Sequence, residues 1–284
     1  MNRTPAERGA AAESGGSLPA VDSPRFAFLD HPHALAFAHR GGALEAPENT
    51  WESFRHAVDL GYRYVETDVH ATSDGTVVTI HDPDLSRTSE RGGAVRDLSW
   101  SQLATVRLSG SDQPVPRLDE VLEAWPEVRW NIDAKHDRVV GPLIETIHRS
   151  AALDRVCITS FNDRRLARIR RALGPRLCTG MGPLATSALR LASVLGPAGA
   201  RSLGDRLTGF GAAQIPIRQG RIPLVDRRLI DTAHRLGIAV HVWTIDDRAT
   251  MEGLLDLGVD GIMTDRPATL KEILVDRRQW EHTS

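Results

Sequence analysis

The chain has 284 residues, of which 41% are hydrophobic and 25% are charged, the proportions of an ordinary globular protein. Its 35 basic and 37 acidic residues leave a net charge of -2, so charge gives no reason to expect nucleic acid as a partner. Both cysteines, Cys157 and Cys178, stand in short apolar runs, where reduced core residues of a cytoplasmic protein are expected.

The amino-terminal segment differs in composition from the rest of the chain. Residues 1–24 are rich in Gly, Ala, Ser and Pro and contain no continuous apolar run, so neither a signal peptide nor a membrane anchor is indicated. We expect residues 1–30 to be a disordered leader and residues 31–284 to form one domain without stable membrane insertion. The sequence does not indicate a protein partner.

Apolar runs with β-branched residues alternate with segments of helical periodicity, the pattern of a parallel α/β fold. Eight strands are predicted, at residues 35–39, 64–68, 129–135, 156–160, 177–180, 213–217, 239–244 and 261–264. Helices are predicted at residues 51–60, 118–125, 139–153, 164–173, 225–236 and 248–257. Eight parallel strands alternating with helices predict a TIM (β/α)8 barrel.

Two insertions interrupt the alternation of strands and helices. Residues 84–117 follow a strand end, so we expect them on the active face as a small cap. Residues 183–210 combine leucines with arginines, a pattern that fits either a lid or membrane-contact helix or, as we prefer, a helix packed on the barrel.

A hairpin is predicted after the second strand, because an Asp74-Gly75 pair separates two runs rich in Val, Thr and Ile. With these two residues as the loop, Asp68 lies opposite His81, and Glu66 lies on the same side as Asp68. A loop of three residues would shift this register.

Three carboxylates, Glu66, Asp68 and Asp133, are predicted at the carboxyl ends of strands, where a TIM barrel carries its active site. Oxygen ligands without cysteine favour a hard divalent cation, Mg²⁺ or Ca²⁺, over structural zinc. The alternative is that each carboxylate pairs with an arginine at the barrel mouth. Glu48 is interpreted as a residue that holds a metal ligand in position without binding the metal itself.

Seven short motifs occur in a fixed order over residues 35 to 275. They are His39-Arg40-Gly41, Pro47-Glu48-Asn49-Thr50, Glu66-Thr67-Asp68, Asp74-Gly75 with His81-Asp82, Asn131-Ile132-Asp133-Ala134-Lys135, Trp243-Thr244 and Thr264-Asp265-Arg266-Pro267. In this order they resemble the glycerophosphodiester phosphodiesterase family. Asp133 departs from the family pattern, which usually has Glu, so this shorter side chain is expected to ligate through a water or to draw the metal inward.

The resemblance implies metal-dependent hydrolysis of a glycerophosphodiester to an alcohol and sn-glycerol 3-phosphate. His39 and His81 are the implied general acid and base, and imidazole suits both roles because it titrates near neutrality. Which of the two is the base stays open. Arg40 and Lys135 are candidates to hold the phosphate oxygens, and Trp243 to line the glycerol pocket.

Two other functions stay open at this stage. The first is phospholipase D-like cleavage of lysophospholipids or sphingolipids, which would need an apolar groove formed by residues 183–210. The second is a non-catalytic barrel that binds phosphate esters or a protein, although such a scaffold has no need of two histidines beside three carboxylates. His70, His241 and Asp265 also lie near strand ends and are interpreted as structural residues.

Overall fold

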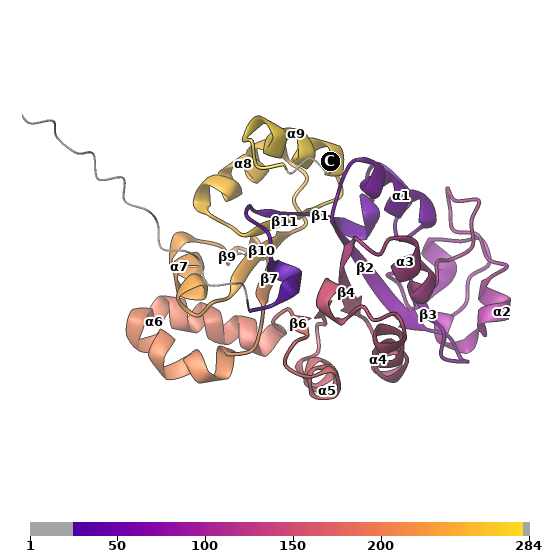
Figure 1. Ribbon diagram of the computed structural model, residues 1–284, viewed down its shortest axis with the longest axis horizontal. Helices are drawn as coiled ribbons and strands as arrows, with labels where there is room; N and C mark the ends of the chain where they lie inside the picture. The colour runs from indigo at the N-terminus through magenta and orange to yellow at the C-terminus, as the bar shows by residue number, and fades with distance from the viewer. Residues whose placement is uncertain (1–24, 281–284) are drawn as a thin grey trace, which may run out of the picture.

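The computed structural model describes residues 25–280, which form a ring of parallel strands surrounded by helices (Figure 1). The order in the sheet is β6-β5-β4-β2-β1-β11-β10-β7, and a parallel bridge between Gly180 and Ala212 joins its two ends. The predicted TIM barrel is therefore confirmed. Its strands are β1 (Leu35–Ala38), β2 (Tyr64–Ala71), β4 (Arg129–Ala134), β5 (Val156–Thr159), β6 (Cys178–Thr179), β7 (Ala212–Pro216), β10 (Ala239–Trp243) and β11 (Gly261–Thr264).

Eight helices pack around the ring. They are α1 (Trp51–Asp59), α3 (Leu118–Ala124), α4 (Val140–Arg149), α5 (Asp163–Leu173), α6 (Pro183–Leu207), α7 (Arg227–Arg235), α8 (Arg248–Leu257) and α9 (Pro267–Asp276). Six had been predicted, and a helix had also been expected within residues 183–210, where α6 lies. Helix α9 was missed, although Pro267 in its first turn and the buried Leu270, Ile273 and Leu274 are ordinary helix signals.

The amino-terminal end of the barrel is closed by a short helix, η1 (Ala27–Leu29), which Figure 1 shows at the opening of the ring. Phe28 is 1% exposed and packs against the rings of Phe37 and Tyr64 at centroid distances of 6.3 and 5.4 Å. The barrel therefore includes residues 25–30, which we had predicted to belong to a leader. Residues 1–24 of that predicted leader lie outside the described residues.

The two insertions have different roles. Residues 84–117 pack on β3 (Val77–Thr79) through an apolar cluster of their own, and Figure 1 shows their helix α2 (Trp100–Leu103) beside the barrel rather than over its opening. Helix α6 packs along α7 and buries Leu189, Ala192 and Leu207. One face of α6 thus packs on the barrel, while Leu191, Val194 and Leu195 on the same helix are exposed.

The hairpin after β2 differs from the predicted register by one position. Val69 lies opposite Thr79 and Ala71 opposite Val77, which leaves three loop residues, 73–75, instead of two. The backbone N–H of Ile80 donates to Asp68 O at 2.9 Å, so Ile80 takes the place that had been predicted for His81.

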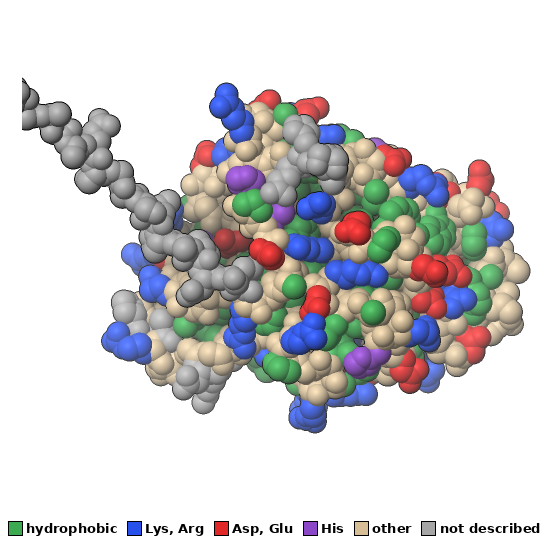
Figure 2. Space-filling view, in the orientation of Figure 1, with side chains coloured by type: hydrophobic (Ala, Val, Ile, Leu, Met, Phe, Trp, Pro, Cys, Tyr) green, Lys and Arg blue, Asp and Glu red, His purple; other side chains and the backbone are tan. Residues whose placement is uncertain are grey.

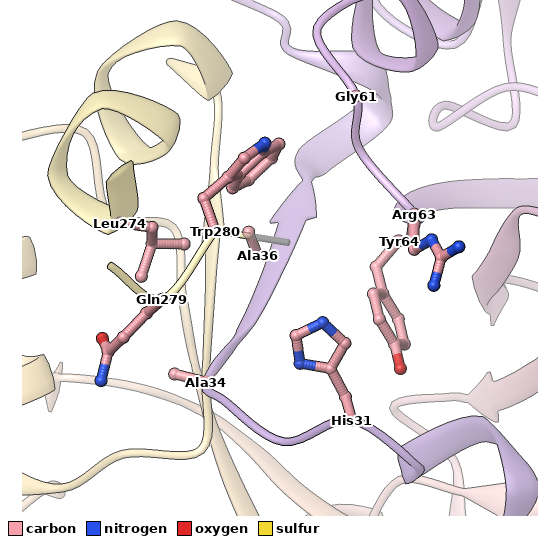
Figure 3. A pocket seen from close by; sticks show the side chains of 9 residues that line it. All are labelled: His31, Ala34, Ala36, Gly61, Arg63, Tyr64, Leu274, Gln279 and Trp280. Carbon is pink, nitrogen blue, oxygen red and sulfur yellow. The ribbon is translucent and has the colours of Figure 1, made fainter. Parts of the chain in front are cut away.

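The base of the barrel contains a small cavity between the segment that leads into β1, with His31 and Ala34, and the carboxyl-terminal residues Gln279 and Trp280 (Figure 3). Its volume is about 30 Å³, the size of one water molecule, and Tyr64 and Trp280 form part of its wall. It is too small for an organic substrate.

Acidic and basic side chains are interspersed over the face of the molecule seen in Figure 2, in keeping with the net charge of -2. Within residues 25–280, no helix is long and apolar enough to cross a membrane.

We expect Phe28→Ala to lower the free energy of unfolding by about 3–5 kcal/mol, because it removes a buried ring from the base of the barrel. Phe161→Ala is the matched control, since Phe161 is 67% exposed and its removal is expected to change stability by less than about 0.5 kcal/mol. Urea unfolding followed by circular dichroism measures both. Equal effects of the two variants would show that η1 does not stabilise the barrel.

A second prediction concerns His241, which is fully buried beside Phe37 in the barrel interior. Burial lowers the pKa of His241 to about 4, below its ordinary value of 6.5. The unfolded chain therefore binds more protons between these pH values, and this residue's contribution to stability falls as the pH drops from 6.5 toward 4, by at most about 1.4 kcal/mol per pH unit.

His241→Leu should accordingly show a shallower loss of stability than the wild type between pH 6.5 and 5. Urea unfolding at several pH values measures the slope. Parallel pH dependences in the two proteins would mean that the imidazole is not held neutral by burial.

Candidate active site

Six of the predicted site residues lie together at the carboxyl ends of three adjacent strands. They are His39 and Arg40 after β1, Glu66 and Asp68 on β2, and Asp133 and Lys135 at the end of β4. The parallel register pairs Asp68 with Asp133 and Glu66 with Asn131, and side chains two residues apart on a strand point to the same face. Sheet pairing alone therefore brings the carboxylates to one side.

Lys135 joins two of these carboxylates. Its Nζ lies 2.7 Å from Asp68 Oδ1 and 2.7 Å from Asp133 Oδ2. Burial works to lower the pKa of Lys135, but the two aspartates outweigh it and the pKa is raised, which keeps the ammonium charged. One cation thus offsets part of the negative charge of the cluster.

Asp68 is the best-partnered carboxylate. Besides Lys135, it lies 3.1 Å from Arg40 Nε and accepts a hydrogen bond of 3.0 Å from Asn49 Nδ2. Burial works to raise the pKa of Asp68, but Lys135 and Arg40 outweigh it and hold the pKa below its usual range. Asn49 also accepts from Thr67 Oγ1 at 2.7 Å, so it fixes the end of β2 from within the loop before α1. This contact of Asn49 with the site was not predicted from the sequence; the side chain that caps α1 is that of Thr50.

Glu66 and Asp133 are held less tightly. Burial, followed by repulsion from Asp68, raises the pKa of Glu66 to about 7, and burial raises the pKa of Asp133 as well. Asp133 Oδ1 is buried without a hydrogen-bond partner. These oxygens have the chemistry that a hard divalent cation requires. In the conformation described, however, no group of three or more His, Cys, Asp and Glu side chains within residues 25–280 is spaced as a metal site, and Lys135 lies between Asp68 and Asp133.

His39 is oriented by a residue from the other end of the chain. Its Nδ1 lies 2.7 Å from Asp265 Oδ1, and its Nε2 lies 3.7 Å from Glu66 Oε2. Burial works to lower the pKa of His39, but Glu66 and Asp265 outweigh it and the pKa is raised. Asp265 had been interpreted as a structural residue, whereas here it fixes the imidazole so that Nε2 faces the site.

Arg40 has a left-handed backbone conformation, with φ of 53°, which is unusual for a residue other than glycine. Its N–H donates to Glu66 Oε2 at 3.1 Å, while its carbonyl accepts from the Asn49 N–H and from Ser53 Oγ, both at 3.0 Å. The next residue has to be glycine, because a Cβ on Gly41 would meet Ser53 at 2.5 Å. Strained backbone of this kind often accompanies functional sites.

Within the part of the chain that the structure describes, His81 forms no ion pair with the three clustered carboxylates; it is connected to Arg40 by a series of ion pairs. Its Nδ1 lies 2.6 Å from Asp82, which also binds Arg87. Arg87 then binds Glu48 at 2.6 Å, and Glu48 accepts from Arg40 Nη1 at 3.2 Å. The insertion after the hairpin thus contributes Arg87, a site residue that we had not predicted.

His70 fixes the backbone of His81. Its Nε2–H donates to His81 O at 3.1 Å, and burial lowers the pKa of His70 so that the ring stays neutral. A structural role for His70, as expected from the sequence, agrees with this contact.

Trp243 lies at the end of β10, on the other side of the mouth. Its ring packs edge-on against Phe161 at 5.9 Å, and Phe161 lies 6.0 Å from Lys135 Nζ. The Trp243 indole is therefore one aromatic ring removed from the charged cluster.

The fold and this cluster define a TIM-barrel enzyme with a group of charged side chains at the carboxyl face of the barrel. Comparison with known proteins gives the family. The model of the Glycerophosphoryl diester phosphodiesterase family matches residues 39–269, so the chain belongs to this family of phosphoric diester hydrolases.

Individual relatives agree with this assignment. The chain is 37% identical over 270 residues to the Mycobacterium tuberculosis protein named probable glycerophosphodiester phosphodiesterase 2, covering 94% of this chain and 99% of the relative. It is 30% identical over 268 residues to lysophospholipase D GDPD1 of Mus musculus, covering 84% and 85%. An Oleispira antarctica phosphodiesterase, solved with the product sn-glycerol-3-phosphate, superposes with a TM-score of 0.70 at 22% identity, covering 85% of this chain and 96% of that one.

We expect Asp265→Asn to lower kcat about 10- to 100-fold with little change in KM, because the His39 ring loses the charge that holds its Nε2 toward Glu66. Steady-state hydrolysis of a glycerophosphodiester measures both constants. Asp260→Asn is the matched control, since Asp260 binds His234 at 2.7 Å outside the site. A matching loss in the control, or a rise in KM alone, would contradict a positioning role.

Proposed function

We propose that this protein hydrolyses glycerophosphodiesters to an alcohol and sn-glycerol 3-phosphate by metal-dependent acid-base catalysis with two histidines. One observation carries the proposal: His39, fixed by Asp265, presents Nε2 beside a buried cluster that combines Arg40 and Lys135 with three carboxylates. A phosphoryl group needs cations for its oxygens and a proton donor for its leaving group, and the cluster offers both. The product bound to the Oleispira antarctica phosphodiesterase supports the same substrate class.

Glu66, Asp68 and Asp133 are proposed to hold the divalent cation, Mg²⁺ or Ca²⁺. Support comes from the unpartnered Oδ1 of Asp133 and from the raised pKa values of Glu66 and Asp133, which a cation would bring down. When bound, such a cation neutralises charge on the phosphoryl oxygens.

The remaining residues have distinct proposed roles. Arg40 and Lys135 bind the phosphate oxygens, while Glu48 holds the Arg40 guanidinium in place. His39 and His81 exchange protons with the nucleophile and the leaving oxygen, and Trp243 lines the pocket for glycerol.

A second candidate is lysophospholipase D activity, the activity named for the Mus musculus relative. It is favoured by Phe161, an exposed aromatic ring beside Lys135 at the mouth, which could contact an acyl chain. Hydrolysis of glycerophosphocholine without release of choline from lysophosphatidylcholine would exclude it.

The test uses protein stripped with EDTA, glycerophosphocholine and glycerophosphoethanolamine as substrates, and release of glycerol 3-phosphate as the signal. Activity should return with Mg²⁺ or Ca²⁺, and His81→Ala should lower kcat about 100- to 10,000-fold because a proton-transfer group is lost. His148→Ala, on the exposed face of α4, is the control. Full activity in EDTA would exclude the metal, and full activity of His81→Ala would exclude the histidine pair.

A further inference from the structure

The mouth of the barrel has two chemically different halves. The charged cluster lies on β1, β2, β4 and β11, which are consecutive in the sheet. Three of the other four strands, β5, β6 and β7, are followed by segments that carry exposed apolar side chains, and these segments gather at the same face because parallel strands end there. The loop after β10 instead carries Asp246 and Asp247.

The apolar side chains of this second half point into solvent. Phe161 after β5 is 67% exposed, Leu184 after β6 is 74% exposed, and Ile222 after β7 is 64% exposed. Large apolar side chains that are exposed together on neighbouring loops often mark an interaction site on a protein surface. We call Phe161, Leu184 and Ile222 the apolar rim.

Helix α6 extends the apolar rim. Leu184, Leu191 and Leu195 are spaced by seven and four residues, which places them on one side of the helix, and Leu191 and Leu195 are 52% and 56% exposed. Val194 beside them is 62% exposed. The strip thus continues from the mouth along the outside of the barrel.

Positive charge accompanies the apolar rim. The loop after β7 forms a small hairpin of β8 (Arg218–Gln219) and β9 (Ile222–Pro223), in which Arg218 and Arg221 are both exposed. Residues 217–224 contain no carboxylate. The nearest acidic residue after β5, Asp163, is engaged as an acceptor for the Leu184 N–H.

We propose that this half of the mouth docks on the surface of an anionic phospholipid membrane. Exposed leucine, isoleucine and phenylalanine side chains insert among lipid headgroups, while arginines beside them attract anionic lipids. A second copy of the chain fits less well, because a twofold contact through the hairpin would bring Arg218 and Arg221 close to their own copies. Docking in this way turns the active site toward the lipid surface, and it uses none of the helices within residues 25–280 as a membrane span.

The experiment measures binding of the full chain to phosphatidylcholine vesicles with and without phosphatidylglycerol, by co-sedimentation at low and high salt. We expect binding only with phosphatidylglycerol, weakened by salt. Arg218→Ala with Arg221→Ala should weaken binding about 25-fold, since each arginine near an anionic surface contributes about fivefold. Leu184→Ser with Ile222→Ser should weaken it at least about tenfold.

Two control variants match these changes. Arg149→Ala with Arg176→Ala removes the same charge from exposed sites on other surfaces, and Val275→Ser removes an exposed apolar side chain from α9. Both should bind as the wild type does. Circular dichroism and thermal unfolding check that each variant is folded. Because co-sedimentation measures binding and not hydrolysis, the result does not depend on the proposed hydrolytic activity.

Three outcomes would overturn the inference. They are no binding to phosphatidylglycerol vesicles at low salt, equal losses in the rim variants and the controls, or a dimer in analytical ultracentrifugation that Leu184→Ser with Ile222→Ser dissociates. The last outcome would assign the apolar rim to self-association.

Discussion

The ion pairs of Lys135 with Asp68 and Asp133 are the interaction on which the site depends. Both aspartates are buried, and two unpaired carboxylates at this depth would repel each other and protonate. Lys135 and Arg40 hold the pKa of Asp68 below its usual range, whereas burial keeps the pKa values of Glu66 and Asp133 raised because these two cations do not fully compensate three buried carboxylates. The cluster is thus short of positive charge, and this deficit is the physical basis for expecting a further cation, from a metal or from protonated His39.

Strain at Arg40 is the second constraint. Its left-handed backbone turns the chain at the end of β1 so that its N–H faces Glu66 while its guanidinium faces Asp68. This conformation is stabilised by hydrogen bonds from Asn49 and Ser53 at the start of α1, and by the lack of a side chain on Gly41. The loop before α1 is therefore part of the site although it supplies few reacting groups.

The sequence predicted the barrel well because alternation of strands and helices is a local signal, and each of the eight strands carried it. The hairpin register was off by one residue, because an Asp-Gly pair marks a turn without fixing whether two or three residues form the loop. Contacts between distant positions had no local signal: Asp265 binds a histidine 226 positions away, and Phe28 joins the base from outside the first strand. Helix α9, by contrast, had ordinary signals that could have been used.

A protein with a net charge of only -2 can still have two chemically different halves at the carboxyl face of its barrel. Net charge is a sum over the whole surface, and it does not show that buried ion pairs gather on β1, β2 and β4 while exposed apolar side chains follow β5, β6 and β7. In the proposed function, a phosphodiester held at the cluster has its phosphate beside Arg40 and Lys135 and its glycerol portion toward Trp243, whose ring packs against Phe161. The loops after β5 and β10 carry Phe161 and Trp243, so substitutions in these loops are expected to change which glycerophosphodiester is accepted without removing the charged cluster.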